Sequence, residues 1–591
     1  MKATTLLFSV ATAGLTHCLV LSVGVAANTA DKLRTPPPNV IIVLTDDQGY
    51  GDLSCHGNPV LKTPFMDRLH GESVRFTDFH VAPMCTPTRG QLLTGQDALR
   101  NAATSVTAGR TYIRQGVPTI GDIFGASGYA TGLFGKWHLG DSYPYRPTDR
   151  GFTVAKTILG WGFSSAPEFD NDYFAGRFQD NNIPKTFSGY CTDFWFSEAM
   201  KWMKDCQEKR RPFLCYLPTN TPHLPAWVAE KYAAPYRLPG LPADFYGMIS
   251  NIDENLGRLE EFLEQSGLRD NTILVFISDN GGFLGAKVFN SGMRGTKKSL
   301  YEGGHRVHCF VRWPNGGLRT PGDVKATVQV QDILPTLLSL CGIKDRLNAQ
   351  FDGADLTDLL KGQDSLPERM LVVQYGEILK KWDSCVIWNK WRLVNGHELY
   401  DIAADPGQET DIAQQHQDVT KQMRDHYEAW WSKLDPSLKE YCPISIGYLQ
   451  ENPVLLTSAD WQDAYCDSVQ NVLRGDGGGK GAPWNVYVER DGEYEITLSR
   501  WPLSRNLALN APCPETRLTV GTLIPGKALP IAAARLTVAG QEHSRKSAAD
   551  DHSVVFRINL KRGQKIKIHG WFQDASGKDL CGAYYAYVKY L

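Results

Sequence analysis

The stretch Asn39-Val40-Ile41-Ile42-Val43-Leu44-Thr45-Asp46-Asp47 places a run of apolar, mostly β-branched residues directly before a polar cluster. A continuous apolar run of this length is typical of a strand buried on both faces of a parallel sheet. The run Ile273-Leu274-Val275-Phe276-Ile277 repeats the design and ends at Ser278-Asp279-Asn280-Gly281. Ligands gather outside the carboxyl ends of strands in open α/β sheets. We therefore expect the two polar clusters to converge, although they lie far apart in sequence.

Helical periodicity accompanies these strands. Residues 194–204 and 245–265 show an amphipathic pattern between the two apolar runs, and residues 411–434 show another further on. Strands that alternate with helices predict an α/β fold, with a mixed sheet flanked by helices.

Size and charge narrow the function classes. A chain of 591 residues exceeds the size at which one hydrophobic core stops growing, so two globular units are expected. With 62 Lys+Arg against 64 Asp+Glu, the formal net charge of -2 offers no broad attraction to nucleic acid or to an anionic membrane. Recognition must therefore come from a local site.

The N-terminus has the pattern of a cleavable signal peptide. Lys2 precedes a largely apolar stretch through Leu21, and the small residues Val25-Ala26-Ala27 follow. We expect residues 1–27 to be removed and the protein to be exported to the periplasm or the extracellular space. An uncleaved membrane anchor is the alternative, but polar residues dilute the stretch. No other run is apolar enough for a stable membrane span.

The pattern changes after residue 434, where Pro436, Pro443 and Pro453 interrupt the chain. Beyond this point apolar and polar residues alternate in 484–488 and again in 494–498, on either side of the turn Asp491-Gly492, which predicts a β-hairpin. We assign residues 453–591 to a β-sandwich-like accessory domain. Its many aromatic residues either form a glycan-binding surface or fill the core of the sandwich, and both interpretations stay open.

The two polar clusters suit a metal ion. Asp46, Asp47, Asp279 and Asn280 offer only oxygen ligands, which a hard cation such as Ca²⁺ or Mg²⁺ prefers. A divalent cation would relieve the repulsion between adjacent carboxylates. Taken alone, each cluster is also an ordinary turn at a strand end.

Between the clusters lies Met84-Cys85-Thr86-Pro87-Thr88-Arg89-Gly90-Gln91-Leu92-Leu93-Thr94-Gly95, in which a Cys precedes a Pro and an Arg at the expected start of a helix. A helix N-terminus and Arg89 one turn further favour negative charge on a bound oxyanion and on the Cys85 thiol. The alternative is a buried or disulfide-bonded cysteine. The chain has 13 cysteines, so an odd number remains once Cys18 leaves with the signal peptide and Cys85 is set apart.

This motif resembles the signature of the sulfatase family, in which the cysteine is oxidised to formylglycine (3-oxoalanine). The commonest form has Ser where Thr88 stands, and the hydroxyl is kept. Further family motifs follow in order around it: Asp46-Asp47-Gln48-Gly49, Gly135-Lys136-Trp137-His138-Leu139-Gly140, Pro222-His223-Leu224-Pro225, Ser278-Asp279-Asn280-Gly281, and Lys297 before Glu302-Gly303-Gly304. Each basic residue alone is as well explained by packing or by solvated charge, but their joint order matches the family.

The resemblance implies an alkaline-phosphatase-like fold over residues 38–448, including a smaller α+β subdomain at about 370–440. It also implies the site residues. The metal ligands are Asp46, Asp47, the modified Cys85, Asp279 and Asn280; the catalytic residues are Cys85, Arg89, Lys136, His138, His223 and Lys297, of which Lys136, His223 and Lys297 also bind substrate.

By the same resemblance we expect one divalent metal, Ca²⁺ before Mg²⁺, and a maturation enzyme that generates formylglycine. The substrate is then a sulfate ester: an aryl sulfate in the assay, and a sulfated carbohydrate as the expected natural target. Two rival functions stay open. One is a phosphomonoester or phosphonate hydrolase of the same superfamily, and the other is a non-catalytic protein that binds sulfated glycans.

Overall fold

The computed structural model describes residues 36–363, 366–438, 440–475 and 479–591. The expected signal peptide, residues 1–27, lies outside the described residues. None of the helices in the described ranges combines the length and the apolar character needed to cross a bilayer.

An 11-stranded mixed sheet forms the centre of the larger part of the molecule, with the order β11-β2-β10-β8-β1-β7-β3-β4-β5-β6 and β9 paired to β2. Its strands are β1 (Asn39–Thr45), β2 (Val74–His80), β3 (Ala130–Lys136), β4 (Val154–Ile158), β5 (Arg177–Asp180), β6 (Ile183–Thr186), β7 (Phe213–Pro218), β8 (Thr272–Ser278), β9 (Arg306–Val307), β10 (Cys309–Arg312) and β11 (Gly322–Gln329). The strands β8, β1, β7, β3 and β4 run parallel, and β10, β5 and β6 are antiparallel to their neighbours. The α/β class with a mixed sheet is confirmed.

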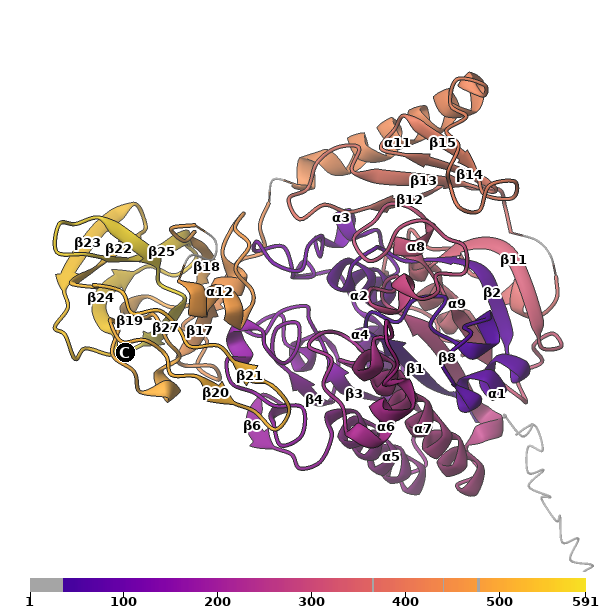
Figure 1. The fold of residues 1–591 in the computed structure, drawn as a ribbon, viewed down its shortest axis with the longest axis horizontal. Helices are drawn as coiled ribbons and strands as arrows, with labels where there is room; N and C mark the ends of the chain where they lie inside the picture. Colours follow the sequence, from indigo (N-terminus) through magenta and orange to yellow (C-terminus); the bar gives the residue numbers. More distant parts are fainter. Residues whose placement is uncertain (1–35, 364–365, 439, 476–478) are drawn as a thin grey trace, which may run out of the picture. The chain divides into compact units, whose positions relative to one another are not determined.

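Helices cover both faces of this sheet (Figure 1). The longer ones are α1 (Pro64–Glu72), α2 (Cys85–Thr94), α4 (Ile120–Ala126), α5 (Cys191–Glu208), α7 (Ala243–Gln265) and α9 (Ile333–Leu340). The short helices are α3 (Ala98–Asn101), α6 (Glu230–Ala233), α8 (Glu302–His305) and α10 (Thr357–Leu360). The helices expected at 194–204 and 245–265 are present as α5 and α7.

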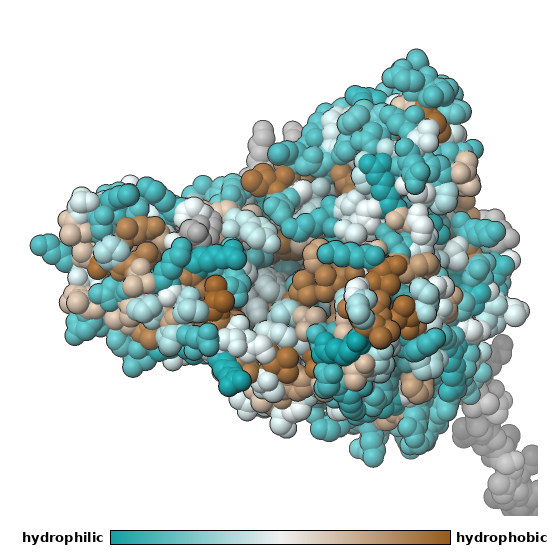
Figure 2. Space-filling model, viewed as in Figure 1, coloured by the Kyte–Doolittle hydropathy of each residue, from teal (hydrophilic) through white to brown (hydrophobic). Residues whose placement is uncertain are grey.

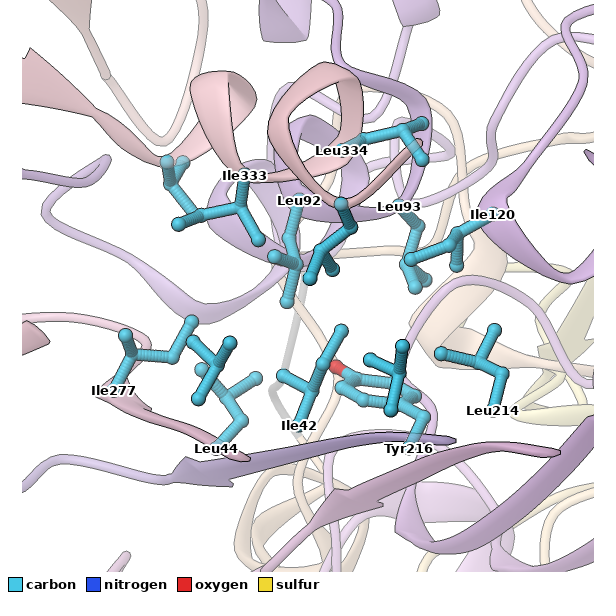
Figure 3. Packing of buried hydrophobic residues seen from close by; sticks show 14 of the residues in the cluster. Ile42, Leu44, Leu92, Leu93, Ile120, Leu214, Tyr216, Ile277, Ile333 and Leu334 are labelled. Atoms are coloured by element: carbon cyan, nitrogen blue, oxygen red, sulfur yellow. The ribbon is translucent and has the colours of Figure 1, made fainter. Parts of the chain in front are cut away.

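The two faces of β1 explain why its apolar run has no polar gap. Ile42 and Leu44 join the cluster under α2, α4 and α9, where Leu92 and Leu93 point toward the strands (Figure 3). Ile41 and its alternate neighbours join the second cluster, with α5 and α7. Because successive strand residues point to opposite faces, only a doubly covered strand buries every residue.

A four-stranded antiparallel sheet follows, with the order β12-β13-β14-β15 and the helix α11 (Gln417–Leu438). Its strands are β12 (Leu371–Gln374), β13 (Ser384–Trp388), β14 (Trp391–Val394) and β15 (Glu398–Asp401). This is the expected smaller α+β subdomain, although α11 begins later than the sequence pattern indicated.

The tail forms two larger sheets, with the orders β16-β18-β25-β22-β23 and β17-β27-β19-β24, and a short pair, β20-β21. Its strands are β16 (Ile444–Ile446), β17 (Val454–Thr457), β18 (Trp484–Val488), β19 (Gly492–Ser499), β20 (Thr516–Arg517), β21 (Thr522–Leu523), β22 (Ala533–Val538), β23 (Gln541–Lys546), β24 (Val554–Leu560), β25 (Lys565–Gln573), β26 (Asp579–Gly582) and β27 (Tyr585–Tyr590); its helix is α12 (Val469–Arg474). One buried cluster unites both larger sheets, and Trp484 and Trp501 belong to it.

The prediction of a β-hairpin over residues 484–498 is wrong. β18 pairs with β25, whereas β19 pairs with β24 and β27 in the other sheet. Alternation identifies which side chains of a strand are buried, and both strands do bury theirs. It does not identify the partner strand, because a chain that crosses between two facing sheets has the same period as a hairpin.

The buried cluster of the tail also contains side chains from the larger part, among them Tyr112, Tyr145 and Phe169.

On the face shown in Figure 2, hydrophilic residues dominate the rim and apolar residues gather near the middle. Among the described residues, the buried cysteines Cys191, Cys206, Cys215 and Cys309 form no disulfide.

Candidate active site

The polar ends of β1 and β8 meet, as the sequence predicted. The two strands are parallel and in register from Asn39 opposite Thr272 to Thr45 opposite Ser278. The backbone N–H of Asp47 donates to Oδ1 of Asp279 at 3.2 Å, and the Asn280 amide donates to Oδ1 of Asp47 at 2.8 Å. These side chains are all buried.

Two residues in this region have backbone conformations that L-residues seldom adopt. Asp47 has φ +71° and His138 has φ +58°. Such conformations cost free energy and persist where the surrounding structure holds them, often at functional sites. Gly281 is required by a close approach, since a Cβ there would lie 1.9 Å from the carbonyl oxygen of Gly303. The segment 302–304 therefore packs closely against the backbone that follows Asp279 and Asn280.

Helix α2 starts at Cys85, and every residue of the helix is buried. Arg89, one turn further, donates to Oδ2 of Asp279 through Nε at 3.1 Å and Nη2 at 2.7 Å, and its Nη1 donates to the Lys136 carbonyl at 2.9 Å. The fork of the guanidinium thus orients Asp279, which a lysine in the same place would not do as rigidly.

Each carboxylate of the site has a basic partner. Lys136 Nζ lies 2.6 Å from Oδ2 of Asp46, and Lys297 Nζ lies 2.6 Å from Oδ1 of Asp47. Lys297 Nζ is also 3.7 Å from the Cys85 sulfur. His223 Nε2 is 3.8 Å from Oδ2 of Asp47.

Burial dominates the protonation of several of these groups. It raises the pKa of the Cys85 thiol to about 12, against the influence of Lys136 and Lys297. For the unmodified thiol, burial therefore opposes the negative charge that the helix N-terminus is expected to favour. Burial also raises the pKa of Asp47, but Lys297 and His223 outweigh it and hold that pKa below the usual range. Burial and Lys297 lower the pKa of His223 to about 3.

The oxygen-rich cluster fits a hard cation. Oδ1 of Asp46 and Oδ1 of Asn280 are buried and have no hydrogen-bond partner among the described residues. Ligand atoms of Asp46, Asp47, Cys85 and His223 all lie within 4.8 Å of one another. Unpaired buried oxygens are costly in a folded protein, and a bound cation would satisfy them.

The charge of the site also fits a cation together with an anionic substrate. Asp46, Asp47 and Asp279 are balanced by Arg89, Lys136 and Lys297. A divalent ion would therefore leave an excess of positive charge where a sulfate or phosphate ester would bind.

His138 is the remaining basic residue of the predicted site. It follows β3, and its Nε2 lies 3.3 Å from the Val106 carbonyl oxygen, while its buried Nδ1 has no partner in the part of the chain that the structure describes. A cavity of about 240 Å³ is lined by Cys85, His138 and His223 together. All the site residues that the sequence indicated thus lie in one buried region, at or next to this cavity.

Sequence reasoning missed part of the lining of the cavity. Trp161 and the tail residues Tyr465, Asp467, Ser468 and Asn471 line it as well. No local pattern marks them, because their place depends on packing between segments more than 300 residues apart.

Comparisons with known proteins agree with this geometry. The family model described as Sulfatase matches residues 38–343, just over half of the chain. Mouse (Mus musculus) arylsulfatase G is 30% identical over 388 residues, covering 58% of this chain and 72% of that protein. Mouse N-acetylgalactosamine-6-sulfatase is 29% identical over 355 residues, covering 55% and 67%.

Among solved structures, Ps i-CgsB in complex with k-i-k-neocarrahexaose is similar, with a TM-score of 0.62 and 25% identity, covering 69% of this chain and 95% of that one. The motifs, the fold and these relatives agree, and the chain is an enzyme that belongs to the sulfatase family.

Proposed function

We propose that this sulfatase hydrolyses sulfate monoesters of carbohydrates through a formylglycine made from Cys85. The observation that carries the proposal is the position of Cys85, buried at the start of α2 with Lys297 Nζ 3.7 Å from its sulfur and with His138 and His223 lining the same cavity. In the hydrated aldehyde, two hydroxyls on one carbon would take the place of the cysteine sulfur. A maturation enzyme that supplies an oxidant would make this aldehyde after synthesis.

The residues around position 85 suit both halves of the reaction. One hydroxyl of the hydrate, deprotonated, attacks sulfur, and the bond from sulfur to the sugar oxygen breaks. His223 and Lys297 hold the sulfate and protonate the departing oxygen, and the negative charge of the bound substrate favours the protonated imidazole that this requires. His138 then takes the proton of the second hydroxyl, so the carbonyl of the aldehyde re-forms and sulfate leaves. Water adds to the aldehyde and restores the hydrate.

A single divalent cation, Ca²⁺ before Mg²⁺, would be held by Asp46, Asp47, Asp279, Asn280 and residue 85. When bound, it supplies electrostatic stabilisation of negative charge on the nucleophile and on the sulfate. The unpaired oxygens of Asp46 and Asn280 support this assignment. Arg89 and Lys136 orient the carboxylates beside it.

The names of the relatives support a carbohydrate substrate. One is named for a 6-sulfated N-acetylgalactosamine, and the solved structure has a bound ligand that is a hexaose by name. The signal-peptide pattern of residues 1–27 supports export to the periplasm or the extracellular space, where sulfated polysaccharides would be met.

Peptide mass spectrometry of the active protein tests the proposal. The fragment with Cys85 should lack sulfur, carry an aldehyde and react with a carbonyl reagent, and Cys85→Ala should abolish hydrolysis of p-nitrophenyl sulfate. Cys85→Ser should be trapped as a stable sulfate ester, because serine has no second hydroxyl to expel sulfate. Full turnover with an unmodified Cys85 would overturn the mechanism. Paired p-nitrophenyl sulfate and phosphate esters distinguish it from the phosphatase alternative, which requires the phosphate to be cleaved faster.

A further inference from the structure

The cavity beside Cys85 has a wall supplied by the far end of the chain. Tyr465, Asp467 and Asn471 of the tail line it together with Cys85 and His223. The match to the sulfatase family model ends at residue 343. These tail residues therefore lie outside the part of the chain that the family model matches.

Backbone hydrogen bonds hold the wall in place. The N–H of Ala166 donates to the Asp467 carbonyl at 2.7 Å, and the N–H of Val469 donates to the Ser164 carbonyl at 2.9 Å. Trp161 Nε1 donates to the same Asp467 carbonyl at 3.1 Å. The tail segment is thus fixed to the loop that follows β4, and a ligand would meet a preorganised surface.

The wall carries polar groups that the protein leaves unused. Asp467 is only 4% exposed, and among the described residues its carboxyl group is bonded by its own backbone N–H and has no ion pair, so burial raises its pKa to about 7. Asn471 uses its Oδ1 to accept from Ser468, which leaves its Nδ2 hydrogens available. A buried carboxyl group with a single hydrogen bond is costly, and a ligand rich in hydroxyl groups would supply further partners.

We propose that Asp467 and Asn471 form a subsite for the sugar ring that carries the scissile sulfate, an inference that rests on the proposed sulfatase activity. The carboxylate accepts hydrogen bonds from ring hydroxyls, and the amide donates to a ring oxygen substituent. Trp161 and Tyr465 offer flat apolar faces to the C–H groups of the ring.

Two properties of the ligand follow. The cavity, about 240 Å³, is smaller than the roughly 300–1,000 Å³ of sites that enclose drug-sized ligands, so it suits one ring. The Asp467 carboxyl group accepts from hydroxyls, has no basic partner to offer a second sulfate, and repels one when ionised, so a ring with free hydroxyls at those positions is preferred to a disulfated one.

The test uses the full-length, formylglycine-containing protein and two kinds of substrate. One is p-nitrophenyl sulfate, which has no ring hydroxyls; the other is a panel of galactose 4-sulfate, galactose 6-sulfate and N-acetylgalactosamine 6-sulfate. Asp467→Asn removes the charge. Asn471→Asp keeps the oxygen that accepts from Ser468 and removes the amide donor. Asp550→Asn, an exposed tail residue outside the cavity, is the matched control.

We expect each subsite variant to lower kcat/KM for the best sugar sulfate at least about tenfold more than for p-nitrophenyl sulfate, since a hydrogen bond to a charged group is worth that factor or more. The control should leave this ratio unchanged. Equal losses on both substrates, no loss, or a wild-type protein that cleaves p-nitrophenyl sulfate but no sugar on the panel would overturn the subsite. Failure of the wild type to cleave any sulfate ester would overturn the proposed function itself.

Discussion

The buried carboxylates of the site are each paired with a basic side chain, and these pairs determine which oxygen atoms stay free to bind a cation. Asp46 lies against Lys136, Asp47 against Lys297, and Asp279 against Arg89. These pairs offset part of the repulsion among the three buried carboxylates, which the sequence alone would not suggest. The oxygens left over, on Asp46 and Asn280, are then the part of the site that a cation completes.

At this scale we predict that Asn280→Ala weakens Ca²⁺ binding about tenfold. The variant loses the Oδ1 ligand and also the hydrogen bond that the Asn280 amide nitrogen donates to Asp47. Isothermal titration calorimetry of chelator-treated protein measures the affinity independently of activity. Asn559→Ala, an exposed asparagine on β24, is the control and should bind as the wild type does. Chelation should also abolish turnover, and added Ca²⁺ should restore it. Unchanged Ca²⁺ affinity in Asn280→Ala would exclude this residue as a ligand.

At the scale of elements, one helix is capped by another. The N-cap residue of α1, Thr63, makes no side-chain cap hydrogen bond. Asp253 of α7 supplies the missing acceptor, because its carboxylate receives the N–H of Phe65 at 3.3 Å and of Met66 at 2.8 Å. This contact fixes two of the helices that cover one face of the sheet.

We predict that Asp253→Ala lowers the free energy of unfolding by about 1–3 kcal/mol, because two buried N–H groups lose their acceptor. Urea unfolding measures the loss. Asp253→Asn keeps an acceptor oxygen and should lose less. Equal losses in both variants would show that the acceptor is not what matters.

The same residue predicts a pH dependence. Burial raises the pKa of Asp253 from 3.8 to about 7. The folded state therefore retains a proton that the unfolded state has released, so this residue's contribution to stability is lost as pH rises from about 4 to about 7. Asn does not titrate, so the deficit of Asp253→Asn relative to the wild type should be smaller at about pH 8 than at about pH 4. A deficit that grows with pH would contradict the raised pKa.

At the scale of the whole molecule, the tail packs into the larger part. Tyr112, Tyr145 and Phe169 are buried in the same cluster as the tail's strands, and Tyr112 donates its hydroxyl to Asp460. The boundaries at 448 and 453 remain predictions. β16, which precedes them, already pairs with β18 of the tail.

We predict that a chain ending at Tyr448 folds with a clearly lower Tm than the full chain, since each large side chain it exposes costs about 1.5–3 kcal/mol of burial. Some turnover of p-nitrophenyl sulfate should remain, because the catalytic motifs lie upstream. Differential scanning calorimetry and the aryl sulfate assay measure the two effects. An unchanged Tm would show that the shared cluster contributes no stability, and complete loss of folding would show that the tail is an obligate part of the core.

By itself the sequence determined the strands β1 and β8, the convergence of Asp46, Asp47, Asp279 and Asn280, and the association of Cys85, Lys136, His138, His223 and Lys297. These follow from local patterns, because an apolar run with a polar end places its last residues at the carboxyl edge of a parallel sheet, and the motif order matches one family. Only the tertiary structure decided that β18 and β19 enter different sheets and that Asp467 and Asn471 line the same cavity as Cys85. Strand partners and cavity walls depend on contacts between segments that are distant in sequence. The residues that make these contacts need only tolerate burial. They therefore carry no periodic pattern or motif by which the sequence could identify them.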